Sequence, residues 1–163
     1  MSPSELFADP MRRNLEVLKM TLADFSDADM LVRPVPHANH AAWQVGHLAV
    51  SEARMMGGYS PSVAATLPAE FAERFTKETT KSDDPKAFPG KAALLDQFEK
   101  TRSATIAWVQ TLAPADLKKP GPERMSRMAP TLGDVLGLAL GHVMMHTGQI
   151  QVIRRKLEKP ILF

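Results

Sequence analysis

The chain has 163 residues, enough to bury one full hydrophobic core, which predicts a single domain over residues 1–163. It contains no cysteine, and this excludes a disulfide scaffold, a thiolate metal site and a cysteine nucleophile. The 20 basic and 18 acidic residues nearly balance, so nothing in the charge indicates a nucleic acid or another polyanion as partner. The first residues, MSPSELFADPMRR, lack the apolar core of a signal peptide, which predicts a cytoplasmic protein.

Proline spacing predicts where the helices lie. Four long windows contain no proline: residues 11–33, 37–60, 90–113 and 131–159. Because proline removes a backbone donor and clashes with the preceding turn, each of these windows can hold a long helix. Apolar residues recur at helical spacing within them, as at Leu15, Leu18 and Leu22, and no stretch sustains the alternation of a strand. The sequence therefore predicts an all-α four-helix bundle.

Local signals refine the predicted helix ends. Asn39 precedes the run AAWQVGHL and is the expected cap of the second helix. Thr131, followed three residues later by Asp134, predicts a capping box at the start of the fourth helix. The basic run RRKLEK lies where the last turn of that helix favours cations.

The connections predict the order in which the helices run. The segment 26–37 is short and suits neighbouring antiparallel helices, whereas residues 57–89 form a long crossover with one short helical candidate at Pro68–Phe75. A long crossover allows the second and third helices to run parallel. The expected topology is therefore up-down-down-up, with the crossover between helices 2 and 3.

One segment is apolar enough to require comparison with a membrane span. Residues Val135–Ile153 include 19 positions without a formal charge. However, His142, His146 and Gln149 lie in its second half, and desolvating these polar side chains in lipid would be costly. We therefore expect a buried bundle helix and no membrane partner.

The five histidines are the strongest indication of chemistry. His142 and His146 are four residues apart, so a helix places both imidazoles on one face, on the same stripe as apolar residues that should face the core. His47 shares its own helix face with Trp43 and Val50 and is also expected to point inward. Three core histidines would leave a fourth metal position open, as in catalytic zinc sites, and Gln149 or a carboxylate could fill it.

The residues around these histidines allow more than one interpretation. Arg54 lies two turns from His47 on the same face and could bind a substrate carboxylate, or form a surface ion pair. His40 lies roughly 10.5 Å from His47 by helical rise, too far to share a metal. It could line the mouth of the pocket, but with His37 it is expected in a solvated loop or helix start. Trp43 is expected as a core anchor that also borders the site.

Two motifs connect these observations to a known family. GHLAVSEAR in the second window and GHVMMHTGQI in the fourth, with the long crossover between them, resemble the DinB/YfiT-like superfamily of metal-binding four-helix bundles. The resemblance covers nearly the whole chain, including the tail KPILF. It implies an up-down-down-up bundle, frequently a homodimer, in which three histidines bind zinc, nickel or a related divalent ion. The matching positions here are His47, His142 and His146.

The resemblance also bears on activity. Characterised relatives use a low-molecular-weight thiol, such as mycothiol or bacillithiol, in S-transfer or isomerisation, while many others have no known activity. We therefore expect a metal-dependent, thiol-dependent S-transferase or hydrolase-like enzyme acting on a small molecule, with Trp43, Arg54 and Gln149 as candidate pocket residues. The alternatives are a non-enzymatic metal-binding or ligand-binding bundle, and a metal-free bundle whose histidines are ordinary core residues. Without cysteine in the chain, any sulfur nucleophile must come from a cosubstrate.

Two further patterns concern packing. Gly133, Gly137 and Gly141 repeat every four residues, with Gly148 seven further on, on a ridge away from the histidines. This ridge is expected to pack against a neighbouring helix or to form part of a dimer contact. The ten methionines, including the pairs 55–56 and 144–145, are expected to fill the core, as is Trp108.

Overall fold

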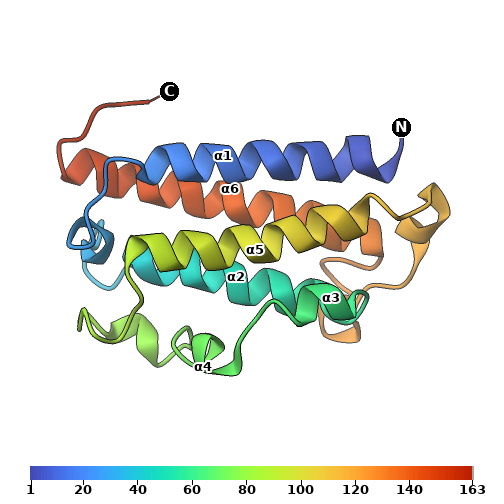
Figure 1. Cartoon of the computed structure of the whole chain (residues 1–163), viewed down its shortest axis with the longest axis horizontal. Coiled ribbons are helices and arrows are strands. Elements are labelled where there is room, and N and C mark those ends of the chain that lie inside the picture. The colour runs from blue at the N-terminus through green and yellow to red at the C-terminus, as the bar shows by residue number, and fades with distance from the viewer. Residues whose placement is uncertain (163) are drawn as a thin grey trace.

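A computed structural model describes residues 1–162 and confirms the all-α bundle. Figure 1 shows the long helices packed side by side. They are α1 (Asp9–Leu22), α2 (Ala41–Met56), α5 (Lys91–Val109) and α6 (Leu132–Lys156). The crossover between α2 and α5 carries two one-turn helices, α3 (Pro61–Ala64) and α4 (Ala69–Ala72). Among residues 1–162 there is no β-strand, only an isolated bridge between Pro120 and Thr131.

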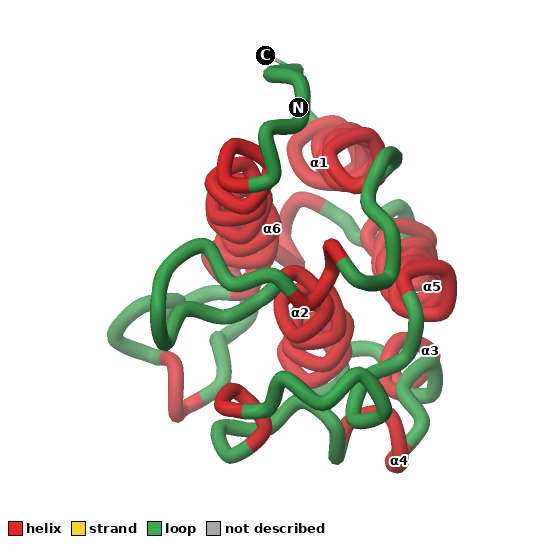
Figure 2. The backbone as a smooth tube through the Cα atoms, turned by 90° about the vertical axis from the view of Figure 1, so that its left-hand side faces the viewer, coloured by secondary structure: helices red, strands yellow, loops and turns green. Residues whose placement is uncertain are grey.

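The helix directions follow the predicted order. In Figure 1, α2 and α5 run from left to right, while α1 and α6 run from right to left. The end-on view of Figure 2 places α1 and α6 on one side of the bundle and α2 and α5 on the other. The long crossover is what lets α2 and α5 lie parallel, as the sequence predicted.

The first helix differs from its predicted window at both ends. A π-helical turn, Ser4–Ala8, leads directly into α1, and Pro10 lies in the first turn of that helix, where a missing N–H is tolerated. The helix ends at Leu22, well before residue 33. Ser26 and Asp29 cap each other's backbone N–H groups, at 2.8 and 3.1 Å, and start a separate short turn. Side-chain caps thus start a new turn inside a stretch that, by its lack of proline, could have continued as one helix.

The second helix begins one residue later than expected. Its cap is His40 and not Asn39: Nδ1 of His40 accepts the backbone N–H of Trp43 at 3.1 Å. Its Nε2 lies 3.1 Å from the carbonyl oxygen of Ser82, so one ring nitrogen accepts while the other donates. His40 therefore lies at a helix start, as expected, but it is fully buried and not solvated, whereas His37 is exposed. The predicted Thr131–Asp134 capping box is confirmed.

The core consists of two apolar clusters separated by polar residues. One cluster contains Trp43, Leu48 and Phe98 and the other Met56, Ile106 and Leu136. On each of three helices, polar side chains occupy the interval between the two clusters. They are Ser51 and Glu52 on α2, Thr101, Arg102 and Thr105 on α5, and His142 on α6. The bundle therefore carries a polar layer near its middle.

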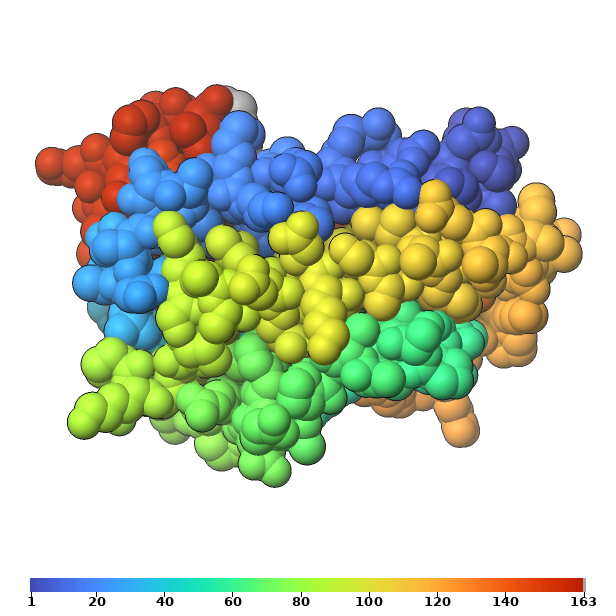
Figure 3. Space-filling model, in the orientation of Figure 1, coloured from blue at the N-terminus to red at the C-terminus, as the bar shows by residue number. Residues whose placement is uncertain are grey.

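The crossover is fastened to α2 close to the histidines. A side chain at Gly46 would overlap the ring of Phe75, so glycine is what allows the crossover to approach the helix so closely. The indole N–H of Trp43 donates to Oγ1 of Thr79 at 3.1 Å, which makes a second connection. In Figure 3 the crossover covers the lower part of the face shown and leaves little of α2 visible.

On the outer face of α6, the structure differs from the expected packing of the glycine ridge and of two methionines. At Gly133 the ridge does meet a neighbouring turn, because a Cβ there would lie 3.4 Å from the carbonyl oxygen of Leu117 in the 3-10 helix Pro114–Lys118. At Gly137, Gly141 and Gly148 a Cβ would meet no other element of the described chain within 4 Å, so this part of the ridge does not pack against a neighbouring helix of the same chain. Met144 and Met145 are exposed beside it, at 43% and 51%, and do not fill the core. Met55 and Met56 are buried as expected. Over residues 1–162, no helix is sufficiently long and apolar to span a membrane.

Candidate metal centre

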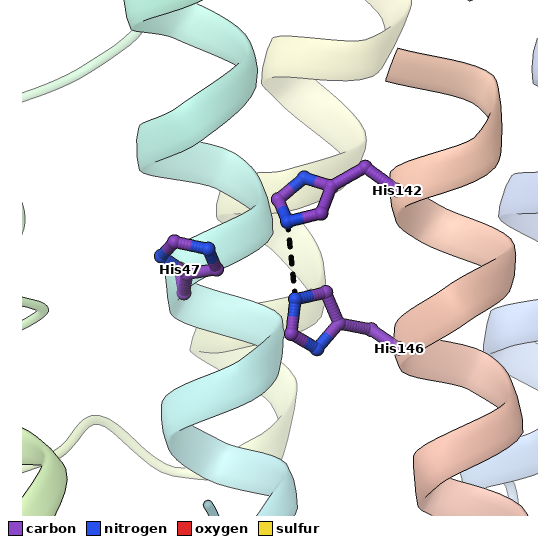
Figure 4. Close-up of side chains that lie close together, drawn as sticks. All are labelled: His47, His142 and His146. Atoms are coloured by element: carbon purple, nitrogen blue, oxygen red, sulfur yellow. Dashed lines mark hydrogen bonds between the residues drawn. The ribbon is translucent and has the colours of Figure 1, made fainter. Parts of the chain in front are cut away.

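Three histidines converge between two helices. Figure 4 shows His142 and His146 projecting from α6 toward α2, which carries His47. One ring nitrogen from each residue can be chosen so that all three atoms lie within 4.8 Å of one another. The structure therefore brings together the three histidines that the helical pattern and the family resemblance selected, and it leaves His37 and His40 outside the group.

The hydrogen bonds of His146 define which of its nitrogens is free. Its Nδ1 lies 2.9 Å from Oε1 of Gln44, and the amide nitrogen of Gln44 donates to the carbonyl oxygen of Asn39 at 2.7 Å. Since a carbonyl can only accept, the Gln44 amide group is oriented with its oxygen toward His146. Nδ1 of His146 must then carry the proton. The lone pair is left on Nε2, which faces Nε2 of His142 at 3.1 Å (Figure 4).

The spacing of the two α6 nitrogens and the chemistry of all three imidazoles fit a divalent ion. Two ligands of a tetrahedral zinc ion with bonds of about 2.0–2.1 Å lie about 3.3 Å apart, close to the separation of the two Nε2 atoms. Imidazole nitrogen is a preferred ligand of zinc, nickel and copper. The hydrogen bond that Nδ1 of His146 donates to Gln44 is the kind of outer contact that orients metal-binding histidines. The three residues could therefore hold a metal ion.

The imidazoles are held in the neutral form. Burial lowers the pKa of His146 to about 3, with further lowering from His142 and His47, while a contact with Gln149 acts weakly in the opposite direction. Burial also lowers the pKa of His47 to about 4, helped by the charges of His142 and Arg54. The pKa of His142 is lowered by burial and by Arg102. At neutral pH, all three rings can thus offer a lone pair without first losing a proton.

The His47 ring is supported from α2 and the crossover. The Trp43 ring stacks on it with centroids 4.6 Å apart and 14° between the planes. Ser51, one turn further along α2, places its hydroxyl oxygen 3.3 Å from Nε2 of His47. Because Trp43 is itself bonded to Thr79, the crossover helps to fix the orientation of the imidazole.

A pocket of about 350 Å³ opens beside the triad. It is lined by His47, Ser51, Arg54, Met55, Arg124, Met125, Leu138 and His142. Of the predicted pocket residues, Arg54 lines this space. Its guanidinium has no acidic partner within the part of the chain described, so the surface ion pair considered as the alternative is wrong. Trp43 lies behind His47, and exposed Gln149 lines a different pocket together with Gln44.

A buried ion pair lies in the polar layer near the triad. Nη2 of Arg102 on α5 is 2.6 Å from Oε2 of Glu52 on α2, with side-chain exposures of 0% and 2%. Within residues 1–162, neither Oε1 of Glu52 nor any guanidinium nitrogen of Arg102 has a partner in hydrogen-bonding geometry. Burial raises the pKa of Glu52, and the charge of Arg102 opposes this rise. The charge of Arg102 also reaches His142, so the pair belongs to the electrostatic surroundings of the site.

Sequence patterns missed Gln44, Arg124 and the Glu52–Arg102 pair. Gln44 lies three residues before His47, so its position on the same helix was a signal available in the sequence. Arg124 comes from the 3-10 turn Glu123–Met125 between α5 and α6, where no periodicity relates it to a helix face.

We expect Gln44→Leu to weaken metal binding by about 10–100-fold, because it frees Nδ1 of His146 from its acceptor. Gln44→Glu keeps an oxygen acceptor and should retain most of the affinity. The measurement is competition with a chromogenic chelator. The matched control is Gln97→Leu, which also removes an amide that donates to a backbone carbonyl, that of Thr66. Equal losses in the Gln44→Leu and Gln97→Leu variants would mean that the effect reflects only general destabilisation.

The metal-free protein is expected to lose stability as the pH falls from about 6.5 toward 4. The folded pKa values of His47 and His146 are about 4 and about 3, below the ordinary 6.5, so the unfolded chain binds more protons in this range. The stabilisation is complete above pH 6.5 and declines on acidification. Thermal melts in EDTA should show the decline, and His47→Gln should reduce it. Acids with a lowered pKa, such as Asp24, titrate below this range. A melting temperature constant across the range would contradict the expectation.

Comparison with known proteins agrees with the fold. The family model of the DinB superfamily matches residues 11–150. No curated protein matches the chain. The chain is similar to a conserved protein from Enterococcus faecalis known from a crystal structure, with a TM-score of 0.71 and 19% identity, over 98% of this chain and 99% of that one. At this identity the likeness shows a shared fold alone.

Proposed function

The chain belongs to the DinB superfamily, and from this premise we propose that it is a metal-dependent enzyme in which His47, His142 and His146 hold one divalent ion. The observation that carries the proposal is the convergence of three neutral imidazoles beside an open pocket. Zinc or nickel is the proposed ion, because imidazole ligands suit both. The triad supplies three ligands, so the proposed fourth position is available to a ligand from the pocket.

The pocket favours thiol transfer over hydrolysis. A divalent ion bound there would act as a Lewis acid that stabilises an anionic nucleophile at neutral pH. No carboxylate is among the lining residues, so the pocket offers no acidic side chain as a general base for water. A thiol loses its proton far more readily than water does. We therefore propose a low-molecular-weight thiol as cosubstrate and S-transfer to a small electrophile as the reaction.

The same absence of an acid also favours a second candidate, a metal-binding bundle that binds a small molecule without transforming it. In this alternative, His47, His142 and His146 still hold the ion, and Met55, Met125 and Leu138 still provide an apolar wall. The two candidates differ only in turnover, so activity measurements on fully loaded protein separate them.

A second copy of the chain is proposed to cover the outer face of α6. Gly137, Gly141 and Gly148 leave this face flat, and exposed Met144 and Val152 make it apolar. Flat apolar helix faces suit close packing against an identical face across a two-fold axis. Sedimentation velocity of the purified protein tests the proposal directly, and a monomer at all concentrations would contradict it.

The proposed function is tested by metal analysis followed by a turnover screen. Protein purified without a histidine tag should contain about one zinc or nickel ion per chain by elemental analysis. The loaded protein is then incubated with mycothiol, bacillithiol or glutathione and a panel of electrophiles, and adducts are detected by mass spectrometry. Adduct formation that stops on chelation and returns on reloading supports the enzyme. Fully loaded protein without turnover across the panel contradicts the enzyme and favours the binding bundle.

A further inference from the structure

Two arginines from distant parts of the chain line the pocket beside the triad. Arg54 projects from α2, and Arg124 comes from the turn between α5 and α6, seventy positions later. The fold therefore brings two guanidinium groups to the mouth of the same cavity that His47 and His142 border.

The positive charge of this pocket is not balanced by the protein. Arg12, Arg33, Arg102 and Arg154 each have an acidic partner within 4.0 Å. Over the described residues 1–162, the other six arginines have none, and two of these six, Arg54 and Arg124, line the cavity. No aspartate or glutamate lines it. The cavity thus presents two uncompensated cationic groups on one side and metal-binding nitrogens on the other.

From this arrangement we infer that the substrate or thiol cosubstrate is a small organic anion whose acidic group binds Arg54 and Arg124. Guanidinium groups bind carboxylates and phosphates through paired N–H donors, so this chemistry suits them better than a neutral ligand. Met55, Met125 and Leu138 line the same cavity and would contact the apolar part of the molecule. A volume of about 350 Å³ limits the ligand to metabolite size. This inference rests on the proposed function, because it assigns the other end of the ligand to the metal.

The test compares two thiols that differ in charge. The probes are 3-mercaptopropionate and its neutral amide, 3-mercaptopropionamide, titrated into cobalt-loaded protein. Thiolate binding is followed by the thiolate-to-cobalt absorption band. The reported quantity is the ratio of the two dissociation constants, compared between variants. Intrinsic differences in thiol acidity cancel in that comparison because they are the same for every variant.

The decisive variant is Arg54→Gln/Arg124→Gln, and the matched control is Arg127→Gln/Arg155→Gln. Arg127 and Arg155 are exposed and do not line the cavity, so the control removes the same net charge elsewhere. The preference for the anionic probe should fall about tenfold in the pocket variant, a size expected for charge-assisted hydrogen bonds at a partly solvated site. It should be nearly unchanged in the control. No fall in the pocket variant, or an equal fall in both, overturns the inference.

Cobalt content, measured in every variant, separates this inference from the proposed function. If the wild-type protein takes up no cobalt, the proposed function fails. The two probes are then titrated into metal-free protein by calorimetry. A preference for the anion that depends on Arg54 and Arg124 would sustain the anion site by itself, and the absence of such a preference would remove it.

Discussion

The His142→Ala variant is expected to lose its bound metal, from about one ion per chain to less than about a tenth, because two imidazoles cannot replace a three-ligand site. His142 is only half-buried, so truncation should leave the helical content intact. Bound metal stabilises the folded state by about 2.7 kcal/mol when its concentration is a hundred times the dissociation constant. Chelation should therefore lower the melting temperature of the wild-type protein and leave that of the variant unchanged. Elemental analysis and thermal melts with and without EDTA make the comparison.

His37→Ala is the matched control. His37 is exposed and lies outside the group of three, so its removal should change neither metal content nor the response to chelator. Equal metal content in His142→Ala and wild-type protein would exclude the triad as the metal site. Metal-free wild-type protein that resists all loading would instead favour the interpretation of the histidines as core residues.

The positions of the long helices could be predicted because proline marks where a helix cannot continue. Proline does not mark where a helix stops for another reason. The window from 11 to 33 contains Leu22, where α1 ends, and the reciprocal caps of Ser26 and Asp29, which start a new turn. The prediction of the α2 cap was wrong because an imidazole nitrogen of His40 accepts the backbone hydrogen bond that the side chain of Asn39 was expected to accept.

The histidine group could be predicted because two of its members share one helix face. Periodicity relates His142 to His146 directly and places His47 on an inward face of its own helix, and the family resemblance then grouped the three. Periodicity does not report which residue of another helix lies opposite a given side chain. Gln44 meets His146 across α2 and α6, and Arg124 reaches the pocket from a turn, so both contacts depend on tertiary structure.

For the glycine ridge, too, the sequence pattern identified a helix face but not what that face contacts. Spacing placed Gly137, Gly141 and Gly148 on one face, and the structure leaves that face open. Small residues permit close approach, but spacing does not say whether the approaching surface belongs to the same chain or to another. The bundle uses other faces of α6 for its own core, so the face from Gly137 to Gly148 stays exposed in the single chain.

Arg102→Met is expected to lower the free energy of unfolding by about 3–5 kcal/mol, since it leaves Glu52 buried without its cation. Burial already raises the pKa of Glu52, and only Arg102 and the hydroxyl of Thr105 oppose that rise. Without Arg102 the folded pKa should rise further, so stability should be lost as the pH rises through it. The variant should accordingly be closest to wild type in acid. Denaturant unfolding at about pH 5 and about pH 7.5 measures both effects.

The double variant Glu52→Leu/Arg102→Met is expected to recover most of that loss, because it leaves no buried charge behind. In the structure, Oε1 of Glu52 and all three guanidinium nitrogens of Arg102 lack a hydrogen-bonding partner within residues 1–162, so the pair regains little of its desolvation energy. The exposed pair of Asp9 and Arg12 provides a control, and Arg12→Met should change stability by less than about 1 kcal/mol. A double variant as unstable as Arg102→Met would show that the ion pair itself stabilises the bundle. If stability returns while metal affinity falls, the pair serves the site, because the charge of Arg102 helps to keep His142 unprotonated and able to bind.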